Sequence, residues 1–307
     1  MKCVISLGPA RGRENLRGYA QMDYKHVLYE KDGPVVRITM NRPEKLNVID
    51  FPGQGGILDN FYAALGEAEE DDEVKVVVIR GAGRSFCAGH DLEVVGFIYG
   101  IGTGQPNERR ASQRIRLKVD RKWMENHLKL LTFPKITIAQ VQGHCIGEGA
   151  LMMEFCDLAV VAEDAQIAHA EQRLGFSGSG LNLLPLYLTV GLKRARELLL
   201  RGRAISGTEA VAMGLANRAV PLDQLEAAVQ EYVDDMVRLP LDGIAIGKAT
   251  NHWILDTLGA TSGLIQGYIS HTMFTNLRFE QGEYNFFRER RGSGTREAFH
   301  ARDDRYE

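Results

Sequence analysis

The sequence lacks three features that would each indicate a class of protein: a long hydrophobic run, a patterned set of cysteines and a large excess of charge. A membrane-spanning helix needs about 20 consecutive apolar residues, and no run in this chain approaches that length. The four cysteines show neither CxxC spacing nor paired histidines, so neither a zinc site nor a disulfide framework is indicated. A net charge of -3 gives no sign of a polyanion-binding surface. We therefore expect no metal, no membrane partner and no nucleic-acid partner.

The composition is that of an ordinary globular protein. Hydrophobic residues make up 44% and charged residues 25% of the 307 positions, which is enough to bury a substantial core. Residues 1–23 carry several basic side chains but no continuous apolar stretch, so they lack the pattern of a secretory signal. We expect them to form an N-terminal extension, although their basic bias is also a weak indication of organelle targeting. Unpaired thiols fit a cytoplasmic location.

Strand and helix patterns alternate in the first part of the chain. Residues 26–30 and 35–40 are two β-rich runs joined by an Asp-Gly turn, which predicts a hairpin. Apolar residues at helical spacing over 57–68 predict a helix, and the valine-rich run 74–79 predicts a buried strand. This alternation is typical of a layered α/β fold.

The second part of the chain is mostly helical in pattern. We expect a core over residues 24–215 and a helical C-terminal region over 216–307, with the boundary where strand patterns end. One candidate helix, 242–274, is too long to continue without interruption. We expect it to break near Gly259 or Gly263, because glycine weakens a helix interior.

A long insertion occupies about residues 93–131, with a glycine-rich loop followed by a helical pattern. Loops of this length are uncommon unless they have a function, often covering a binding site. The helical part begins with a group of basic residues: Arg109, Arg110, Arg114, Arg116 and Lys118. They form either a solvated helix face or a group that meets the phosphates of a ligand.

Two glycine-bearing turns, at residues 85–92 and 142–149, are the most informative part of the chain. Each follows an apolar run that predicts a buried strand, at 74–79 and 135–141, and each precedes a segment that can start a helix. Such turns leave backbone N–H groups without partners. Two of them side by side could bind one oxygen that gains negative charge during a reaction, which is an oxyanion hole.

With these turns, the sequence resembles the enoyl-CoA hydratase/isomerase (crotonase) superfamily over about residues 24–306. The segments that carry the resemblance are residues 41–47, 86–92, 143–149, 156–159, 165–171, 202–206, 212–216 and 298–302. The resemblance implies an α/β fold with a spiral core of repeated ββα units and a helical C-terminal trimerisation region. It also implies a homotrimer or a dimer of trimers, an acyl-CoA thioester as substrate, and no cofactor beyond the coenzyme A of that substrate.

The resemblance also assigns binding residues. It implies that the backbone N–H groups of His90 and Glu148 form the oxyanion hole for the thioester oxygen. The residues expected to line the substrate site are Lys45, Leu46, Ala88, Gly89, Gly147, Leu151, Phe299 and Arg302, the last two reaching coenzyme A from a neighbouring subunit. Lysine and arginine suit its phosphates because they stay charged and offer several donors.

One of the family's two catalytic glutamates matches Glu171, whereas the other falls on Leu151. Leucine can neither accept a proton nor orient a water molecule, so hydration by two carboxylates is in doubt. We hypothesise that Glu148 and Glu171 form a substitute pair, the alternative being that Glu148 shapes the pocket or forms a salt bridge. The His90 side chain either takes part in catalysis or is structural, and His127, His144 and His169 are interpreted as structural.

These patterns predict an enzyme that stabilises a thioester enolate, first of all an enoyl-CoA hydratase-type lyase with Glu171 as acid/base. The alternatives within the superfamily are an enoyl-CoA isomerase and a hydrolase or decarboxylase that cleaves a C–C bond. An alternative of another class is a non-catalytic homologue that binds acyl-CoA or RNA, since a local basic helix lies at 109–118.

Overall fold

The computed structural model describes residues 24–93, 112–175, 183–274 and 280–307. A six-stranded sheet lies at its centre, in the order β1-β2-β3-β4-β6-β8. β1 pairs antiparallel with β2, and every later neighbour in this sheet pairs in parallel. The strands are β1 (Val27–Asp32), β2 (Val35–Met40), β3 (Val76–Gly81), β4 (Ile136–Val141), β6 (Leu158–Ala162) and β8 (Arg218–Val220). The predicted hairpin and α/β class are confirmed.

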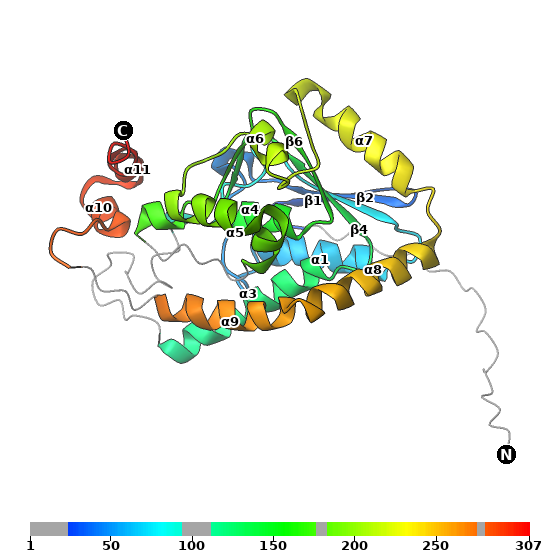
Figure 1. Ribbon diagram of the computed structural model, residues 1–307, viewed down its shortest axis with the longest axis horizontal. Coiled ribbons are helices and arrows are strands. Elements are labelled where there is room, and N and C mark those ends of the chain that lie inside the picture. Colours follow the sequence, from blue (N-terminus) through cyan, green and yellow to red (C-terminus); the bar gives the residue numbers. More distant parts are fainter. Residues whose placement is uncertain (1–23, 94–111, 176–182, 275–279) are drawn as a thin grey trace, which may run out of the picture.

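Helices cover both faces of the sheet (Figure 1), with α7 over one face and α1 over the other. The α-helices with described bounds are α1 (Ile57–Glu70), α3 (Gln113–Leu131), α4 (Glu148–Phe155), α5 (Leu184–Arg201), α6 (Gly207–Ala212), α7 (Leu225–Met236), α8 (Leu241–Thr257), α9 (Ala260–Phe274), α10 (Phe286–Ser293) and α11 (Thr295–Asp303). Short 3-10 turns are η1 (Pro43–Lys45), η2 (Glu171–Leu174) and η3 (Leu222–Gln224). Among the described helices, none combines the length and apolar character that a membrane crossing requires.

A second, smaller layer of extended segments lies beside the main sheet. Each of four main strands is followed by a turn and then by one of these segments. β5 (His144–Ile146) follows β4, and β7 (Gln166–Ala168) follows β6, and the two pair in parallel. Isolated bridges add Ile49 against His90 and Cys87 against Cys145. This repetition of a long strand, a short strand and a helix confirms the expected ββα units.

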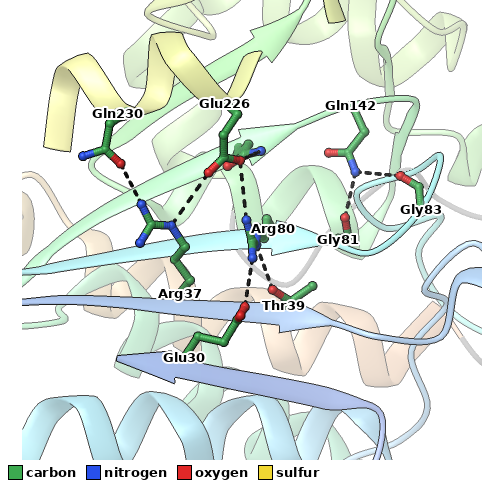
Figure 2. Close-up of polar contacts among 10 residues, drawn as sticks. Glu30, Arg37, Thr39, Arg80, Gly81, Gly83, Gln142, Glu226 and Gln230 are labelled. Atoms are coloured by element: carbon green, nitrogen blue, oxygen red, sulfur yellow. Dashed lines mark hydrogen bonds and ion pairs between the residues drawn. The ribbon is translucent and has the colours of Figure 1, made fainter. Parts of the chain in front are cut away.

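Polar contacts attach α7 to its face of the sheet (Figure 2). Arg37 donates to Gln230 across 2.7 Å, and the Nε of Arg80 donates to Thr39 across 2.9 Å. Arg80 also lies 3.4 Å from Glu226 of α7. The opposite face of the sheet is apolar and packs on α1, whose side chains Leu58, Ala64 and Leu65 are fully buried. The polar contacts with α7 are confined to part of the α7 face of the sheet, which also buries Val78 and Ile138 against the core.

Two boundaries depart from or refine the sequence patterns. The sheet continues beyond residue 215, where strand patterns were expected to end, because β8 pairs with β6. The long helical stretch is divided into α8 and α9 at Gly259, whose φ of +96° is in the left-handed region that favours glycine. The predicted break is thus confirmed at the first of the two candidate glycines.

The Asn47 side chain joins two segments. One is the loop that follows β2, and the other is the first glycine turn. Its side chain is fully buried, with Oδ1 accepting from the N–H of Arg42 at 2.8 Å. Its Nδ2 donates to the carbonyls of Ala82 and Ser85 at 2.9 and 2.8 Å. Asn47 also has a φ of +55°, which asparagine tolerates better than most residues. This side chain therefore sets the position of the loop that carries Lys45.

We expect Asn47→Ala to lower the free energy of unfolding by about 2–4 kcal/mol, because it leaves three buried or partly buried backbone groups without partners. Urea denaturation followed by circular dichroism measures the change. The control is Asn251→Ala on the exposed side of α8, which should stay within about 0.5 kcal/mol of the wild type. Equal stability of the two variants would contradict this role of Asn47.

Candidate active site

The two glycine turns lie side by side, held by backbone hydrogen bonds. The N–H of Cys87 donates to the carbonyl of His144 at 2.9 Å, and the N–H of Ile146 donates to the carbonyl of Cys87 at 3.0 Å. The Gln142 side chain donates to the carbonyls of Gly81 and Gly83 at 2.7 and 3.1 Å, as Figure 2 shows. β4 is thereby bound to the end of β3, so the turns that follow the two strands start from a common edge.

The amide of His90 lies on the side of the first turn that faces away from Ile49. On its other side, the carbonyl of Gly89 accepts from Ile49 at 2.9 Å, and the N–H of Asp91 donates to Ile49 at 2.8 Å. Successive amides of an extended segment point to opposite edges. The N–H of His90 therefore faces away from Ile49, and it has no acceptor within the described residues.

The backbone nitrogen of Glu148 lies near the first turn. The N–H of Gly147 donates to the carbonyl of Ala168 on β7 at 2.8 Å. Glu148 is the first residue of α4, and a helix leaves its first N–H groups without internal partners. A Cβ atom placed on Gly89 would lie 3.7 Å from the Glu148 nitrogen. The amide of Glu148 thus lies close to Gly89 of the first turn.

The close approach of the turns depends on glycine. A Cβ on Gly149 would lie 2.3 Å from the carbonyl oxygen of Cys87, and one on Gly89 would lie 2.6 Å from that of Ile146. Gly89 also has a φ of +84°. A side chain at either position would push the two turns apart, so these glycines are required for the geometry of the amides.

Glu171 brings a carboxylate to the edge of this site. It begins η2, three residues after β7, and its Oε1 lies 3.1 Å from the position of a Cβ on Gly147. Its Oε2 is buried and has no hydrogen-bond partner in the described part of the chain. A carboxylate oxygen without a partner next to free amides is suited to exchange a proton with a bound molecule.

Leu151 lies on α4, one turn beyond Gly147, and is 3% exposed. It occupies the position at which the resemblance places a second catalytic glutamate. A buried apolar side chain there presents no group that can hold water or transfer a proton. This leaves Glu171 as the carboxylate near the His90 and Glu148 amides. Its Oε2 has no hydrogen-bond partner among the residues that the structure describes.

The Glu148 side chain is engaged with two histidines. Its Oε1 lies 2.6 Å from Nε2 of His127 on α3, and its Oε2 lies 3.9 Å from Nε2 of His90. Burial alone would raise the pKa of Glu148, but the charge and hydrogen bond of His127, together with His90 and His271, outweigh it and lower the pKa. The Glu148 carboxylate therefore favours its ionised form and lies within hydrogen-bond distance of the His127 ring.

His90 carries its ring in an aromatic environment. The ring centroid lies 4.6 Å from that of Trp123 and 6.5 Å from that of Phe51. Burial lowers the pKa of His90 to about 4, despite the nearby Glu148 carboxylate, which acts to raise it. The imidazole is thus neutral at physiological pH, with a buried Nδ1 that has no partner within the described chain.

One face of α3 carries the polar residues that support Glu148. Arg116, Asp120, Trp123 and His127 recur at spacings of four, three and four, and all are buried. This periodicity, with tryptophan in its centre, is the signal that could have identified His127 as a partner of the site. Arg116 is buried and lies 3.4 Å from Asp120, so for this residue the solvated face is wrong, whereas Arg114 and Lys118 are exposed on α3. Arg109 and Arg110 lie outside the described residues.

Asp120 joins α3 to α9. It accepts a hydrogen bond from Thr272 at 2.6 Å and lies 3.1 Å from Nδ1 of His271. The ring of His271 packs edge-on against Trp123, at 6.2 Å between centroids. A continuous buried network therefore runs from α9 through α3 to His90. Within the described residues, no group of three or more histidine, cysteine, aspartate or glutamate side chains is arranged to hold a metal ion.

Lys45 and Leu46, which are expected near coenzyme A, lie close to Ala88 of the first glycine turn. The N–H of Ala88 donates to the carbonyl of Leu46 at 3.0 Å. The Nζ of Lys45 lies 2.8 Å from Glu93 and 3.5 Å from Asp91. The Asp91 carboxylate also accepts from the N–H of Glu93 at 3.0 Å, as expected for a helix cap. Lys45 is thus held beside the first turn by two carboxylates.

Phe299 and Arg302 lie on α11 at the C-terminal end. Phe299 packs on Phe286 of α10 at 5.0 Å, and the guanidinium of Arg302 lies over the Phe299 ring and beside Asp303. Asp303 in turn lies 4.0 Å from Arg173 of η2. These contacts link α11 to the segment that begins with Glu171, but among the described contacts none joins Phe299 or Arg302 to the glycine turns.

Comparisons with known proteins point to one family. Residues 30–293 match the sequence model of a family described as Enoyl-CoA hydratase/isomerase. A Mycobacterium tuberculosis protein named "Putative enoyl-CoA hydratase EchA13" is 30% identical over 276 residues, which cover 85% of this chain and 84% of that protein.

Solved structures show the same similarity. An enoyl-CoA hydratase/isomerase from Xanthobacter autotrophicus Py2 is 29% identical with a TM-score of 0.78, covering 92% of this chain and 98% of that chain. An enoyl-CoA hydratase from Mycobacterium smegmatis is 25% identical with a TM-score of 0.78, covering 94% of this chain and 96% of that chain. The similarity thus extends over nearly the whole of each protein.

We expect Gly149→Ala to lower the free energy of unfolding by about 3 kcal/mol, because its new methyl group would overlap the Cys87 carbonyl and separate the turns. Differential scanning calorimetry and denaturant titration measure the change. The matched control is Gly247→Ala, at an exposed helical position with no heavy atom within 4 Å of the added Cβ. That variant should gain about 0.5–1 kcal/mol from helix propensity. If both variants change the free energy of unfolding in the same direction, the close contact of Gly149 with the Cys87 carbonyl is not required.

We expect His90 to remain neutral between pH 5 and 8, because burial places its pKa near 4. The unfolded chain binds a proton at this residue below about 6.5, whereas the folded protein does so only near 4. Its contribution to stability is therefore present above about pH 6.5 and is lost as the pH falls toward 4. Nitrogen-15 NMR of the imidazole, assigned with the variant His90→Gln, measures the protonation state. A charged His90 ring at pH 6 would refute this.

Proposed function

Because the chain belongs to the enoyl-CoA hydratase/isomerase family, we propose that it hydrates the double bond of an enoyl-CoA thioester, with Glu171 as acid/base. The observation that carries the proposal is the unpartnered carboxylate oxygen of Glu171 beside Gly147, next to two facing amides. The names of its relatives, which are enoyl-CoA hydratases or hydratase/isomerases, favour hydration as the reaction.

In this proposal the thioester oxygen accepts hydrogen bonds from the amides of His90 and Glu148. Water adds its oxygen to Cβ while Glu171 takes a proton from it, and the electrons of the double bond move onto the thioester as an enolate. The enolate oxygen then carries the negative charge that the two amides stabilise. Glu171 returns the proton to Cα, so one molecule of water has been added and the carboxylate is restored.

For this mechanism to work, the negative charge of the Glu148 side chain has to be offset by a nearby group. The amide at the start of α4 favours an anion, but the carboxylate of the same residue would repel one. His127 lies 2.6 Å from that carboxylate and provides a donor that offsets its charge. We propose that His127 and Glu148 act as a pair that shapes this wall of the site, and that Glu148 contributes chiefly through its backbone N–H.

A second candidate is favoured by Leu151. An apolar side chain in place of a second carboxylate suits the shift of a double bond, which needs no water. Glu171 would take a proton from Cα of a 3-enoyl-CoA, the enolate would form in the same pair of amides, and Glu171 would deliver the proton to Cγ. Both reactions use the same base and the same oxyanion hole. The cleavage of a C–C bond beside the thioester stays a third possibility of the same chemistry.

The binding of coenzyme A involves residues of the first turn and of a neighbouring subunit in this proposal. We propose that Lys45, Leu46, Ala88 and Gly89 bind the coenzyme A portion of the substrate, with Phe299 and Arg302 contributing from a neighbouring subunit of a homotrimer or dimer of trimers. No cofactor other than this coenzyme A takes part. The cationic side chains suit phosphate groups because they keep their charge. We propose a cytoplasmic location for the reaction.

Two substrates and one exchange reaction test the proposal. Wild-type protein is incubated with crotonyl-CoA and with a 3-enoyl-CoA, and the products are identified by mass spectrometry. Hydration of crotonyl-CoA supports the leading proposal, and conversion of the 3-enoyl-CoA without hydration supports the second. Saturated acyl-CoA in deuterated water should gain deuterium at Cα under either. Absence of all three reactions would contradict enolate chemistry.

We expect Glu171→Gln to lower kcat by about 10²–10⁴-fold, because the amide cannot accept or return a proton. Glu148→Gln keeps the backbone N–H and should lower kcat far less. The matched control is Glu163→Gln, an exposed carboxylate just after β6, which should leave kcat unchanged. Steady-state kinetics with the better of the two substrates measures these values. A Glu171→Gln variant with wild-type turnover would refute the assigned base.

A further inference from the structure

The Glu148 carboxylate uses one of its two oxygens within the described part of the chain. Its Oε1 lies 2.6 Å from Nε2 of His127, whereas its Oε2 faces Nε2 of His90 at 3.9 Å. The longer distance exceeds that of a hydrogen bond. An ionised carboxylate can accept several hydrogen bonds through both oxygens. Oε2 therefore keeps a capacity to accept a hydrogen bond, on a side chain that is only 2% exposed.

Aromatic packing orients the imidazole of His90. Its ring centroid lies 4.6 Å from that of Trp123 and 6.5 Å from that of Phe51, and these two rings meet edge-on at 5.3 Å. Both are buried. Burial lowers the pKa of His90 to about 4, so the ring is neutral and carries its proton on one nitrogen. Because Nε2 faces a carboxylate, the proton is favoured on Nε2.

The space between Nε2 of His90 and Oε2 of Glu148 fits one oxygen atom. An oxygen about 2.8 Å from each of two atoms can bridge a separation of 3.9 Å. It would accept from the imidazole N–H and donate to the carboxylate. A hydroxyl group can do both, whereas a methyl group does neither and an ammonium cannot accept. A carboxylate placed there would be repelled by Glu148.

His90 is the member of this group that reaches accessible space. Its side chain is 18% exposed, compared with 2% for Glu148 and 0% for His127. His90 and Glu148 are also the residues whose backbone N–H groups are proposed to bind the thioester oxygen. The gap between their side chains therefore lies within one side-chain length of that oxygen. A substrate group that reaches the gap is part of the acyl chain, close to the thioester carbonyl.

We propose that His90 and Glu148 form a subsite for a hydroxyl group, and that the preferred substrate is an enoyl-CoA whose acyl chain carries a hydroxyl close to the double bond. This inference rests on the proposed function, which puts the thioester oxygen at the amides of the same two residues. It makes His90 a specificity-determining residue, and it gives the Glu148 side chain a role in choosing the substrate and not in proton transfer.

A purely structural role does not explain the arrangement. The contact of Glu148 with His127 is sufficient to join α4 to α3. Buried polar groups in folded proteins nearly always have partners. Here a donor and an acceptor face each other at a distance that neither can close, and Nδ1 of His90 is also buried without a partner in the described chain. A hydroxyl supplied by the substrate gives both groups a partner.

The test compares two thioesters of nearly the same shape. 4-Hydroxycrotonyl-CoA and 2-pentenoyl-CoA carry a hydroxyl and a methyl group, respectively, on the same carbon. For the wild type, kcat/KM should be about 10–100-fold higher with the hydroxyl, because the methyl group leaves a donor and an ionised acceptor without partners. Equal values would overturn the inference, since the gap would then hold no more than water.

Two variants separate the donor from the ring. His90→Phe keeps the aromatic packing but removes the N–H, so the ratio of the two kcat/KM values should fall about tenfold or more. His90→Gln places an amide N–H near the position of Nε2 and should keep most of the preference. The control is His252→Phe on α8, which should keep the wild-type ratio. Each ratio compares two substrates on one preparation, so a loss of folded protein in a variant cancels.

The inference and the proposed function fail in different ways. If the wild type shows no preference, or if His90→Phe keeps the wild-type ratio, the hydroxyl subsite is overturned and the proposed function stands. If neither thioester reacts and a saturated acyl-CoA gains no deuterium at Cα, the proposed function fails and the inference fails with it.

Discussion

The backbone pairing of Cys87 with β5 is the interaction on which the rest of the site depends. Its two hydrogen bonds, of 2.9 and 3.0 Å, place one glycine turn against the other. We propose that the amides of His90 and Glu148, which follow on these turns, face the same space. No side chain has to reach into this space to stabilise an anion, so side chains around it are available for other tasks.

The two buried carboxylates on α4, near the glycine turns, each lie against a histidine. Glu148 is matched by His127, and Glu154 by His169, so α4 carries two carboxylates that each meet a histidine from another element. His90, which has only a distant carboxylate, is held neutral by its burial. Low polarity makes an uncompensated ion costly. The buried Oε2 of Glu171, which has no hydrogen-bond partner among the described residues, supports the proposal that Glu171 is the base.

Sequence patterns predicted the strands, turns and helices of this protein better than the contacts of its buried polar side chains. The two turns were found because each follows a buried strand, and the ends of adjacent parallel strands share an edge. The break at Gly259 followed from helix length and glycine. The pairs His127–Glu148 and His169–Glu154 were not foreseen, because they depend on how α3 and β7 dock on α4. Arg116 was misjudged since a basic residue is normally expected at the surface.

A crystal structure with a bound, slowly reacting acyl-CoA thioester tests the central claim most directly. The account predicts that the thioester oxygen lies about 2.7–3.1 Å from both the His90 and the Glu148 backbone nitrogens, with Glu171 facing Cα or Cβ. A thioester oxygen bound by side chains or solvent, with either amide more than about 3.5 Å away, would contradict it.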